Sequence, residues 1–152
     1  MSLLEVSGLS IRFGATEAVS DVSFSLERGE RFGIIGESGS GKTLTALAVT
    51  GLLPEGAAMT GSISLDGASL PASERAMARL RGKRVGMVFQ EPMTALNPLM
   101  RVNDQIEESI RLNEMHGATQ IEVPYLLKEV GLELRHGDRF PHQLSGGQRQ
   151  RV

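Results

Sequence analysis

The chain has 152 residues, no cysteine, and 16 basic against 18 acidic residues, which gives a net charge of −2. This composition excludes a disulfide framework, a thiolate metal site and a broad basic surface for nucleic acid. The chain shows no stretch close to the roughly 20 apolar residues that span a bilayer, and no signal-peptide pattern follows Met1. Hydrophobic residues make up 40% and aromatic residues 4%, so we expect a globular fold with an aliphatic core.

The first third of the chain has the pattern of an α/β protein. Weak alternation of apolar and polar residues predicts strands at 4–6, 11–13 and 22–26. The short apolar run "RFGIIG" at 31–36 is bounded by glycine and predicts a buried strand. "KTLTALAVTG" at 42–51 predicts a helix that ends at Gly51.

The middle of the chain repeats this pattern. "GSISLDG" at 61–67 alternates between two turn glycines and predicts a strand, and "ASERAMARLRG" at 72–82 predicts a short helix. "RVGMVFQ" at 84–90 predicts another buried strand. We therefore expect residues 1–92 to form one part of a single domain.

The pattern changes to helix after Gln90. Residues 91–100 contain two prolines and are expected to form a loop, and Ile106 and Ile110 lie four residues apart, as on one helix face. "PYLLKEVGL" at 124–132 predicts a helix with proline in its first turn. Residues 93–152 are therefore expected to form a helical part.

"GESGSGKT", which begins at Gly36, fits the phosphate-loop pattern G-x-x-x-x-G-K-[ST] in full. Its glycines permit a tight turn whose N–H groups can surround phosphate oxygens. Lys42 supplies a cation for the β- and γ-phosphates, and Thr43 supplies a hydroxyl for Mg²⁺. The alternative is a glycine-rich turn with a chance lysine. A predicted strand before it and a predicted helix after it favour the nucleotide site.

"LSGGQ" at 144–148 is a second glycine cluster. Ser145 can cap a helix, and Gly146 and Gly147 leave its first N–H groups bare. Alone, this is equally an ordinary capped helix start. Together with the phosphate loop, the chain resembles the nucleotide-binding subunit of an ABC transporter, in which LSGGQ is the signature motif.

The resemblance implies the fold and the site. The fold would be α/β: a P-loop NTPase core with an antiparallel β subdomain, plus an α-helical subdomain that carries the signature. Gln90 matches the Q-loop glutamine that contacts Mg²⁺ or the attacking water, and Phe13 matches the adenine-stacking aromatic. Alternatively, Gln90 is a polar strand end and Phe13 a core residue. The implied nucleotide-contacting residues are Phe13, Gly36, Glu37, Ser38, Gly39, Ser40, Gly41, Lys42, Thr43, Thr45, Ser145, Gly146, Gly147 and Gln148. Lys42 and Gln90 would be catalytic, and Thr43 and Gln90 would hold the metal.

The stretches "QEPMTALNPLMRV" and "RFPHQLSGGQRQRV" are similar to the ATPases of bacterial dipeptide, oligopeptide and nickel importers. The cofactors implied are ATP and Mg²⁺. The implied partners are membrane permease subunits, a second ATP-binding subunit and, indirectly, a periplasmic or extracellular binding protein. The implied location is the cytoplasmic face of the bacterial inner membrane, as a peripheral subunit.

Later motifs of the family are expected after the signature: a strand ending in Asp-Glu, and a histidine. They lie outside residues 1–152, so we expect a partial domain, incomplete at its C-terminus, that binds nucleotide and hydrolyses it weakly or not at all. Two alternatives stay open, a soluble ABC ATPase without a transport role and an interaction-only fragment. His136 and His142 lack neighbours at metal-ligand spacing and are expected to be solvated or structural.

Overall fold

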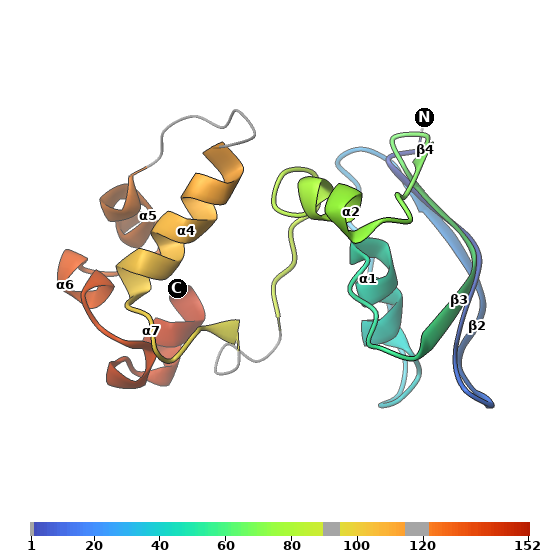
Figure 1. Cartoon of the computed structure of the whole chain (residues 1–152), viewed down its shortest axis with the longest axis horizontal. Helices are drawn as coiled ribbons and strands as arrows, with labels where there is room; N and C mark the ends of the chain where they lie inside the picture. Colours follow the sequence, from blue (N-terminus) through green and yellow to red (C-terminus); the bar gives the residue numbers. More distant parts are fainter. Residues whose placement is uncertain (1, 90–94, 115–121) are drawn as a thin grey trace. The chain divides into compact units, whose positions relative to one another are not determined.

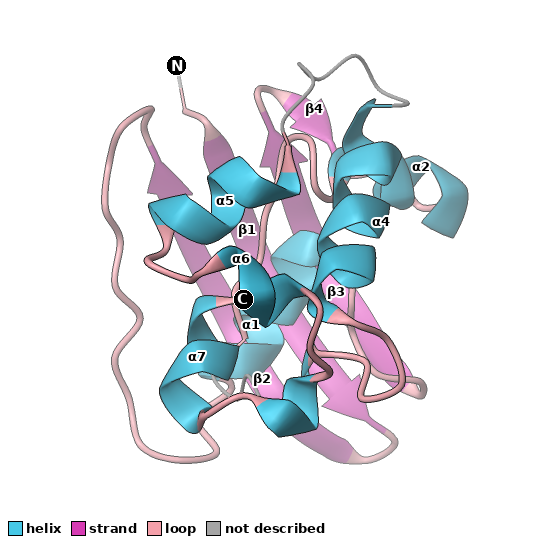
Figure 2. Ribbon diagram, turned by 90° about the vertical axis from the view of Figure 1, so that its left-hand side faces the viewer, coloured by secondary structure: helices cyan, strands magenta, loops and turns pink. Residues whose placement is uncertain are grey.

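The computed structural model describes residues 2–89, 95–114 and 122–152. The chain divides into two compact units, residues 1–85 and 86–152, which are described separately (Figures 1 and 2). Strands and helices are both present, so the fold is mixed α/β. None of the helices within the described residues is long and apolar enough to cross a membrane.

An antiparallel sheet forms the frame of the first unit. Its strands are β1 (Leu4–Phe13), β2 (Thr16–Leu26), β3 (Ala57–Leu65) and the short β4 (Ala68–Ser69), in the order β2-β1-β3-β4. The register pairs Leu4 with Leu26 on one side and with Leu65 on the other. The strands expected from alternation are therefore confirmed, and they are longer than the sequence pattern indicated.

Two helices accompany this sheet, α1 (Lys42–Thr50) and α2 (Glu74–Leu80). Both were predicted, and the predicted end of α1 is confirmed because Gly51 follows it with a φ of +64°. Helix α1 lies against one face of the sheet (Figure 1). The core of this unit consists of Val6, Leu9, Ile11, Val19, Ala48 and Ile63.

The two expected buried strands at 31–36 and 84–90 are wrong. Residues 31–36 form no helix or strand and are exposed, and Ile35 keeps 98% of its surface accessible. Val88 is equally exposed, and among residues 84–89 strand-type pairing is limited to an isolated bridge between Arg81 and Val85. An apolar run becomes a buried strand only when a neighbouring strand takes its backbone hydrogen bonds. No strand among the described residues does so here.

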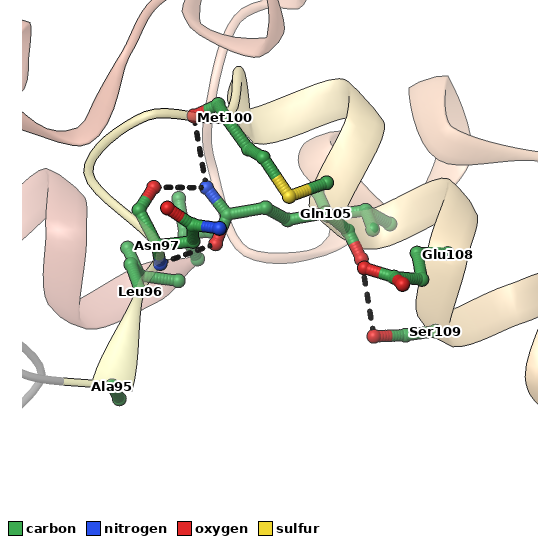
Figure 3. Close-up of a pocket in the computed structure, with 9 residues that line it drawn as sticks. Ala95, Leu96, Asn97, Met100, Gln105, Glu108 and Ser109 are labelled. Atoms are coloured by element: carbon green, nitrogen blue, oxygen red, sulfur yellow. Dashed lines mark hydrogen bonds between the residues drawn. The ribbon is translucent and has the colours of Figure 1, made fainter.

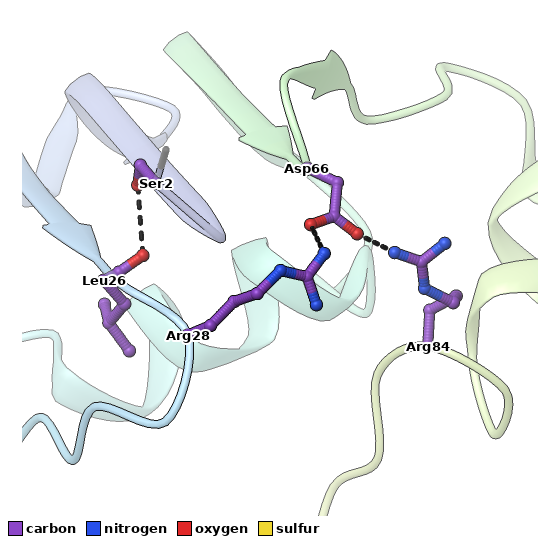
Figure 4. A network of polar contacts seen from close by, with 5 residues as sticks. All are labelled: Ser2, Leu26, Arg28, Asp66 and Arg84. Carbon is purple, nitrogen blue, oxygen red and sulfur yellow. Dashed lines mark hydrogen bonds and ion pairs between the residues drawn. The ribbon is translucent and has the colours of Figure 1, made fainter.

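A charged network ties three segments of the first unit together (Figure 4). Asp66 lies at the turn between β3 and β4 with a φ of +51°, and its carboxylate accepts from both Arg28 and Arg84. Nearby, the Ser2 hydroxyl donates to the Leu26 carbonyl at 3.1 Å. The network holds the chain at Arg28, shortly before the exposed segment 31–36, and at Arg84, the first residue of the segment 84–90.

The second unit is helical within its described residues, as the sequence predicted. It contains α4 (Val102–Glu114), α5 (Val123–Glu129), α6 (Leu134–Gly137), a 3₁₀ turn (Pro141–Gln143) and α7 (Gly146–Arg151). Its core consists of Val102, Val123, Leu127, Leu132 and Leu144. Because Leu144 belongs to this core, the segment that starts α7 is anchored by packing.

Candidate functional site

The phosphate loop follows the exposed segment 31–36 and leads into α1. Two of its glycines occupy positions where a side chain would not fit. Gly41 is buried with a φ of +86°, and a Cβ there would lie 2.6 Å from Val19 Cγ2 and 2.7 Å from the Ala18 carbonyl. A Cβ on Gly36 would lie 2.6 Å from Ser40 Oγ. Side chains at these positions would fill space that the loop needs for its turn. The turn of the loop therefore depends on glycine at these two positions.

Lys42 lies at the first position of α1, and its ammonium group turns back over the loop. Its Nζ donates to the Gly36 carbonyl at 2.8 Å, to the Glu37 carbonyl at 2.6 Å and to Ser40 Oγ at 3.3 Å. The structure therefore brings the cation and the loop oxygens together within one turn. An ammonium held in this way is placed to meet a phosphate group.

The other predicted residues of the loop differ in exposure. Thr45 is buried, and its hydroxyl donates to the Gly41 carbonyl at 3.0 Å, so this residue supports the loop from within α1. Thr43 is exposed. The remaining loop residues are exposed as well; they are Glu37, Ser38, Gly39 and Ser40. Their backbone is open to a ligand.

The chemistry of these donors fits a nucleotide better than a bare metal ion. The loop offers backbone N–H groups, a lysine and the exposed Thr43 hydroxyl, which suit phosphate oxygens and a phosphate-bound Mg²⁺. No cluster of three His, Cys, Asp or Glu side chains occurs in the part of the chain that the structure describes. A metal at this loop would therefore take most of its ligands from the phosphates and from water.

Two residues singled out by the resemblance remain predictions. Phe13 ends β1, pairs with Thr16 and Ala57, and packs partly buried against the core of the first unit. This packing agrees with the core alternative and leaves a role in adenine stacking to experiment. Gln90 lies outside the described residues.

The segment that follows Gln90 is held by the side chain of Gln105 on α4 (Figure 3). Its Oε1 accepts from the Asn97 N–H at 2.9 Å, and its Nε2 donates to the Asn97 and Met100 carbonyls, each at 3.0 Å. These residues line an open depression of about 430 Å³. Gln105 thus fixes the loop between residues 95 and 100 to the helical unit.

The signature segment begins α7 with a complete capping box. Ser145 is the N-cap, and its Oγ accepts from the Gln148 N–H at 3.2 Å. In return, Gln148 Oε1 accepts from the Ser145 N–H at 2.9 Å. The predicted helix cap is confirmed. Gly146 and Gly147 are exposed, and a Cβ on either would meet no atom within 4 Å, so the structure leaves this surface open.

Two residues that the sequence analysis did not place at the site support this segment. His136 is buried, and its Nε2 lies 3.1 Å from Gln148 Nε2, which confirms the expected structural role. Arg151 donates to the carbonyls of Val130 and Gly131, at 3.4 and 3.2 Å, and so ties α7 to the end of α5. No motif marks such links, because they join segments that are distant in sequence.

Electrostatics around α6 are dominated by its N-cap residue, Glu133. The hydrogen bond from Arg135 holds the pKa of the Glu133 carboxyl below its ordinary value. Desolvation opposes this hydrogen bond, and the charges of Arg135 and Arg139 add smaller effects that lower the pKa. Glu133 is therefore a carboxylate at neutral pH beside the element that contacts the signature segment.

The family model described as "ABC transporter" matches residues 19–152. Oligopeptide transport ATP-binding protein OppD from Mycobacterium tuberculosis is 44% identical over 99% of the chain and 26% of its own length. The protein of the same name from Lactococcus lactis subsp. cremoris is also 44% identical, over 99% of the chain and 48% of its own length. Glutathione import ATP-binding protein GsiA from Salmonella typhimurium is 42% identical over 99% of the chain and 27% of its own length. The chain thus spans less than half the length of these relatives.

Solved structures resemble the fold. An ATP-binding subunit of an ABC transporter matches with a TM-score of 0.75 and 27% identity, covering 99% of this chain and 59% of that one. A dimeric bacterial ABC transporter cassette matches with a TM-score of 0.77 and 24% identity, covering 97% of this chain and 66% of that one. The second match supports the fold alone.

Proposed function

Because the chain belongs to the ABC transporter family, we propose that it is the nucleotide-binding portion of an importer ATPase for peptides or related small cargo. The observation that carries this proposal is the phosphate loop, in which Lys42 Nζ donates to the Gly36 and Glu37 carbonyls and Gly41 has no room for a side chain. The names of the similar proteins, which are import ATP-binding proteins for oligopeptides and glutathione, support import over a non-transport role.

In this proposal, the first unit binds the phosphates of ATP. The N–H groups of residues 36–41 donate to phosphate oxygens, Lys42 neutralises their charge, and the Thr43 hydroxyl contacts the metal. Mg²⁺, when bound with ATP, neutralises the charge that develops during phosphoryl transfer. Thr45 keeps the loop in place through its bond to the Gly41 carbonyl. Phe13 is proposed to contact the adenine.

The second unit acts on the nucleotide of a partner subunit. Ser145, Gly146, Gly147 and Gln148 are proposed to contact the ATP held by the phosphate loop of another subunit, so that two subunits enclose two nucleotides. Gln90 is proposed to contact Mg²⁺ or the attacking water and to transmit the nucleotide state to permease subunits. The loop held by Gln105 lies a few residues after Gln90 in the sequence, which supports a coupling role for this region. We propose ATP hydrolysis and a peripheral location at the membrane for the whole subunit, of which this chain is a part.

The test is a titration of the chain with a fluorescent ATP analogue and Mg²⁺, with Lys42→Ala beside it. We expect saturable binding that Lys42→Ala weakens at least about tenfold, since a charge-assisted contact to phosphate is lost. Lys128→Ala on α5 is the matched control, because it removes the same charge outside the phosphate loop. Equal affinities for the parent chain and Lys42→Ala, with circular dichroism unchanged, would contradict the proposal.

A further inference from the structure

His136 is a buried ionisable side chain to which the proposed function gives no role. Only 6% of its surface is exposed, and it lies on α6, between the N-cap of that helix and the capping box of α7. Its two ring nitrogens make separate contacts. Nδ1 lies 2.9 Å from the Glu133 backbone nitrogen, and Nε2 lies 3.1 Å from the side-chain nitrogen of Gln148. The ring therefore bridges two helix starts.

The orientation of the Gln148 amide is set by its other contact. Its Oε1 accepts from the Ser145 N–H at 2.9 Å, and reversing the amide would place two donors against each other there. The amide nitrogen of Gln148, which is a donor, therefore faces the imidazole. The Glu133 backbone N–H, also a donor, faces the opposite side of the ring.

A neutral imidazole cannot accept both of these hydrogen bonds, because one of its nitrogens always carries a proton. With the proton on Nδ1, the ring accepts from Gln148 and opposes the Glu133 N–H. With the proton on Nε2, it accepts from Glu133 and opposes the Gln148 amide. Each tautomer satisfies one helix start and leaves an opposed pair of donors at the other.

We propose that His136 is a positioning residue for the signature glutamine Gln148, and that its ring exchanges between these two tautomers. The Nδ1–H form holds the capping box of Ser145 and Gln148, and the Nε2–H form holds the N-cap of α6. The inference rests on the proposed function in one respect, which is that Gln148 contacts the nucleotide. The contact itself stands on the geometry of the helical unit.

The proposal makes a specific claim about Gln148→Glu. A carboxylate accepts at both oxygens, so it can accept from the Ser145 N–H and from His136 Nε2–H at the same time. Nδ1 is then free to accept from Glu133, and every donor has an acceptor. This substitution should fix the ring in the Nε2–H tautomer, whereas Gln148→Ala should remove the competition and leave only the Glu133 contact.

The test is nitrogen-15 NMR of the His136 ring in the full 152-residue chain at neutral pH. We expect intermediate shifts for Nδ1 and Nε2 in the parent chain, which report exchange between tautomers. Gln148→Glu and Gln148→Ala should both give the shifts of a single Nε2–H tautomer. Ring shifts that are identical in all three proteins would overturn the proposal, because the ring would then be indifferent to residue 148.

Two substitutions of His136 separate its contacts. The amide of His136→Gln reaches the position of Nε2, and the shorter amide of His136→Asn reaches that of Nδ1. We expect hydrogen exchange at the Ser145 and Gln148 amides to be nearly unchanged in His136→Gln and about fivefold faster in His136→Asn, as for one lost hydrogen bond. Exchange at the buried Leu127 reports whether each variant is folded. Equal exchange at Ser145 and Gln148 in both variants would overturn the proposal.

The nucleotide titration separates the positioning role of His136 from the proposed function. Both His136 variants retain the phosphate loop, so binding of the ATP analogue should equal that of the parent chain. Failure of the parent chain to bind nucleotide would overturn the proposed function and leave the tautomer result standing. Normal binding with a ring that does not respond to residue 148 would overturn the positioning role alone.

Discussion

Two glycines of the phosphate loop differ in what surrounds them. Gly39 and Gly41 both have positive φ, but a Cβ on Gly39 would meet no atom within 4 Å, whereas one on Gly41 would meet Val19 and Ala18. We expect Gly41→Ala to lower the free energy of unfolding by more than about 2 kcal/mol, from backbone strain and overpacking combined. Gly39→Ala should cost about 1 kcal/mol. Urea denaturation measures both, and equal losses would contradict the packing described at Gly41.

The carboxyl of Glu133 predicts a pH dependence for α6. Its pKa in the folded chain lies below the ordinary 4.5, chiefly because of the hydrogen bond from Arg135. A lowered folded pKa means that the stabilisation is fully present above the unfolded pKa and is lost as the pH falls through the folded value. Glu133→Gln should therefore lose less stability than the parent chain on acidification below about pH 4.5. Thermal unfolding at neutral and acidic pH measures this, and parallel losses would contradict it.

Helix α7 is short, and its attachment depends on Arg151. This side chain donates to the carbonyls of Val130, Gly131 and Gly147. We expect Arg151→Ala to lower the free energy of unfolding of the helical unit by about 1 kcal/mol, because a charged donor to these three exposed carbonyls is lost. Gln150→Ala is the matched control, since residue 150 of the same helix is exposed. A loss as large in the control would contradict a specific role for the contacts of Arg151.

Helices α1 and α7 could be predicted from local sequence, whereas the strands predicted at 31–36 and 84–90 were wrong. Helix α1 is bounded by Gly41 and Gly51, and α7 begins at its N-cap, Ser145. The residues that end or begin these helices are therefore visible in the sequence itself. The runs at 31–36 and 84–90 have equally clear apolar patterns. Their burial depends on a neighbouring strand, and a pattern within one segment does not show whether that neighbour is in place.

The molecule exposes apolar side chains on these two segments. Ile35 and Val88 each keep 98% of their surface accessible, with Phe32 and Phe89 about half exposed. Large exposed apolar side chains promote association, so we expect the chain to self-associate as its concentration rises. Ile35→Ser with Val88→Ser should reduce this association without lowering the melting temperature. Sedimentation velocity and thermal unfolding measure the two effects.

The control for this prediction is a buried residue of the same type. Ile11 is fully buried in the sheet, so Ile11→Ser should destabilise the first unit by about 2–4 kcal/mol. If the exposed pair destabilised the chain as much as Ile11→Ser, residues 31–36 would be packed in solution rather than exposed.

At the scale of the whole chain, the residues of the candidate site could be predicted from the sequence, but the distant contacts that hold the signature segment could not. The phosphate loop and the capped signature segment follow from residue spacing, and both have the expected local structure. The contact between His136 and Gln148 joins residues twelve positions apart, and Arg151 reaches back twenty positions to Gly131. Such links arise from packing around Leu127 and Leu144 and have no signature in spacing.

The ammonium group of Lys42 already has three oxygen partners within its own loop. An incoming phosphate therefore displaces existing acceptors instead of supplying the first ones, and the affinity reflects a difference between two sets of bonds. The net gain on binding is therefore smaller than the number of new phosphate contacts suggests.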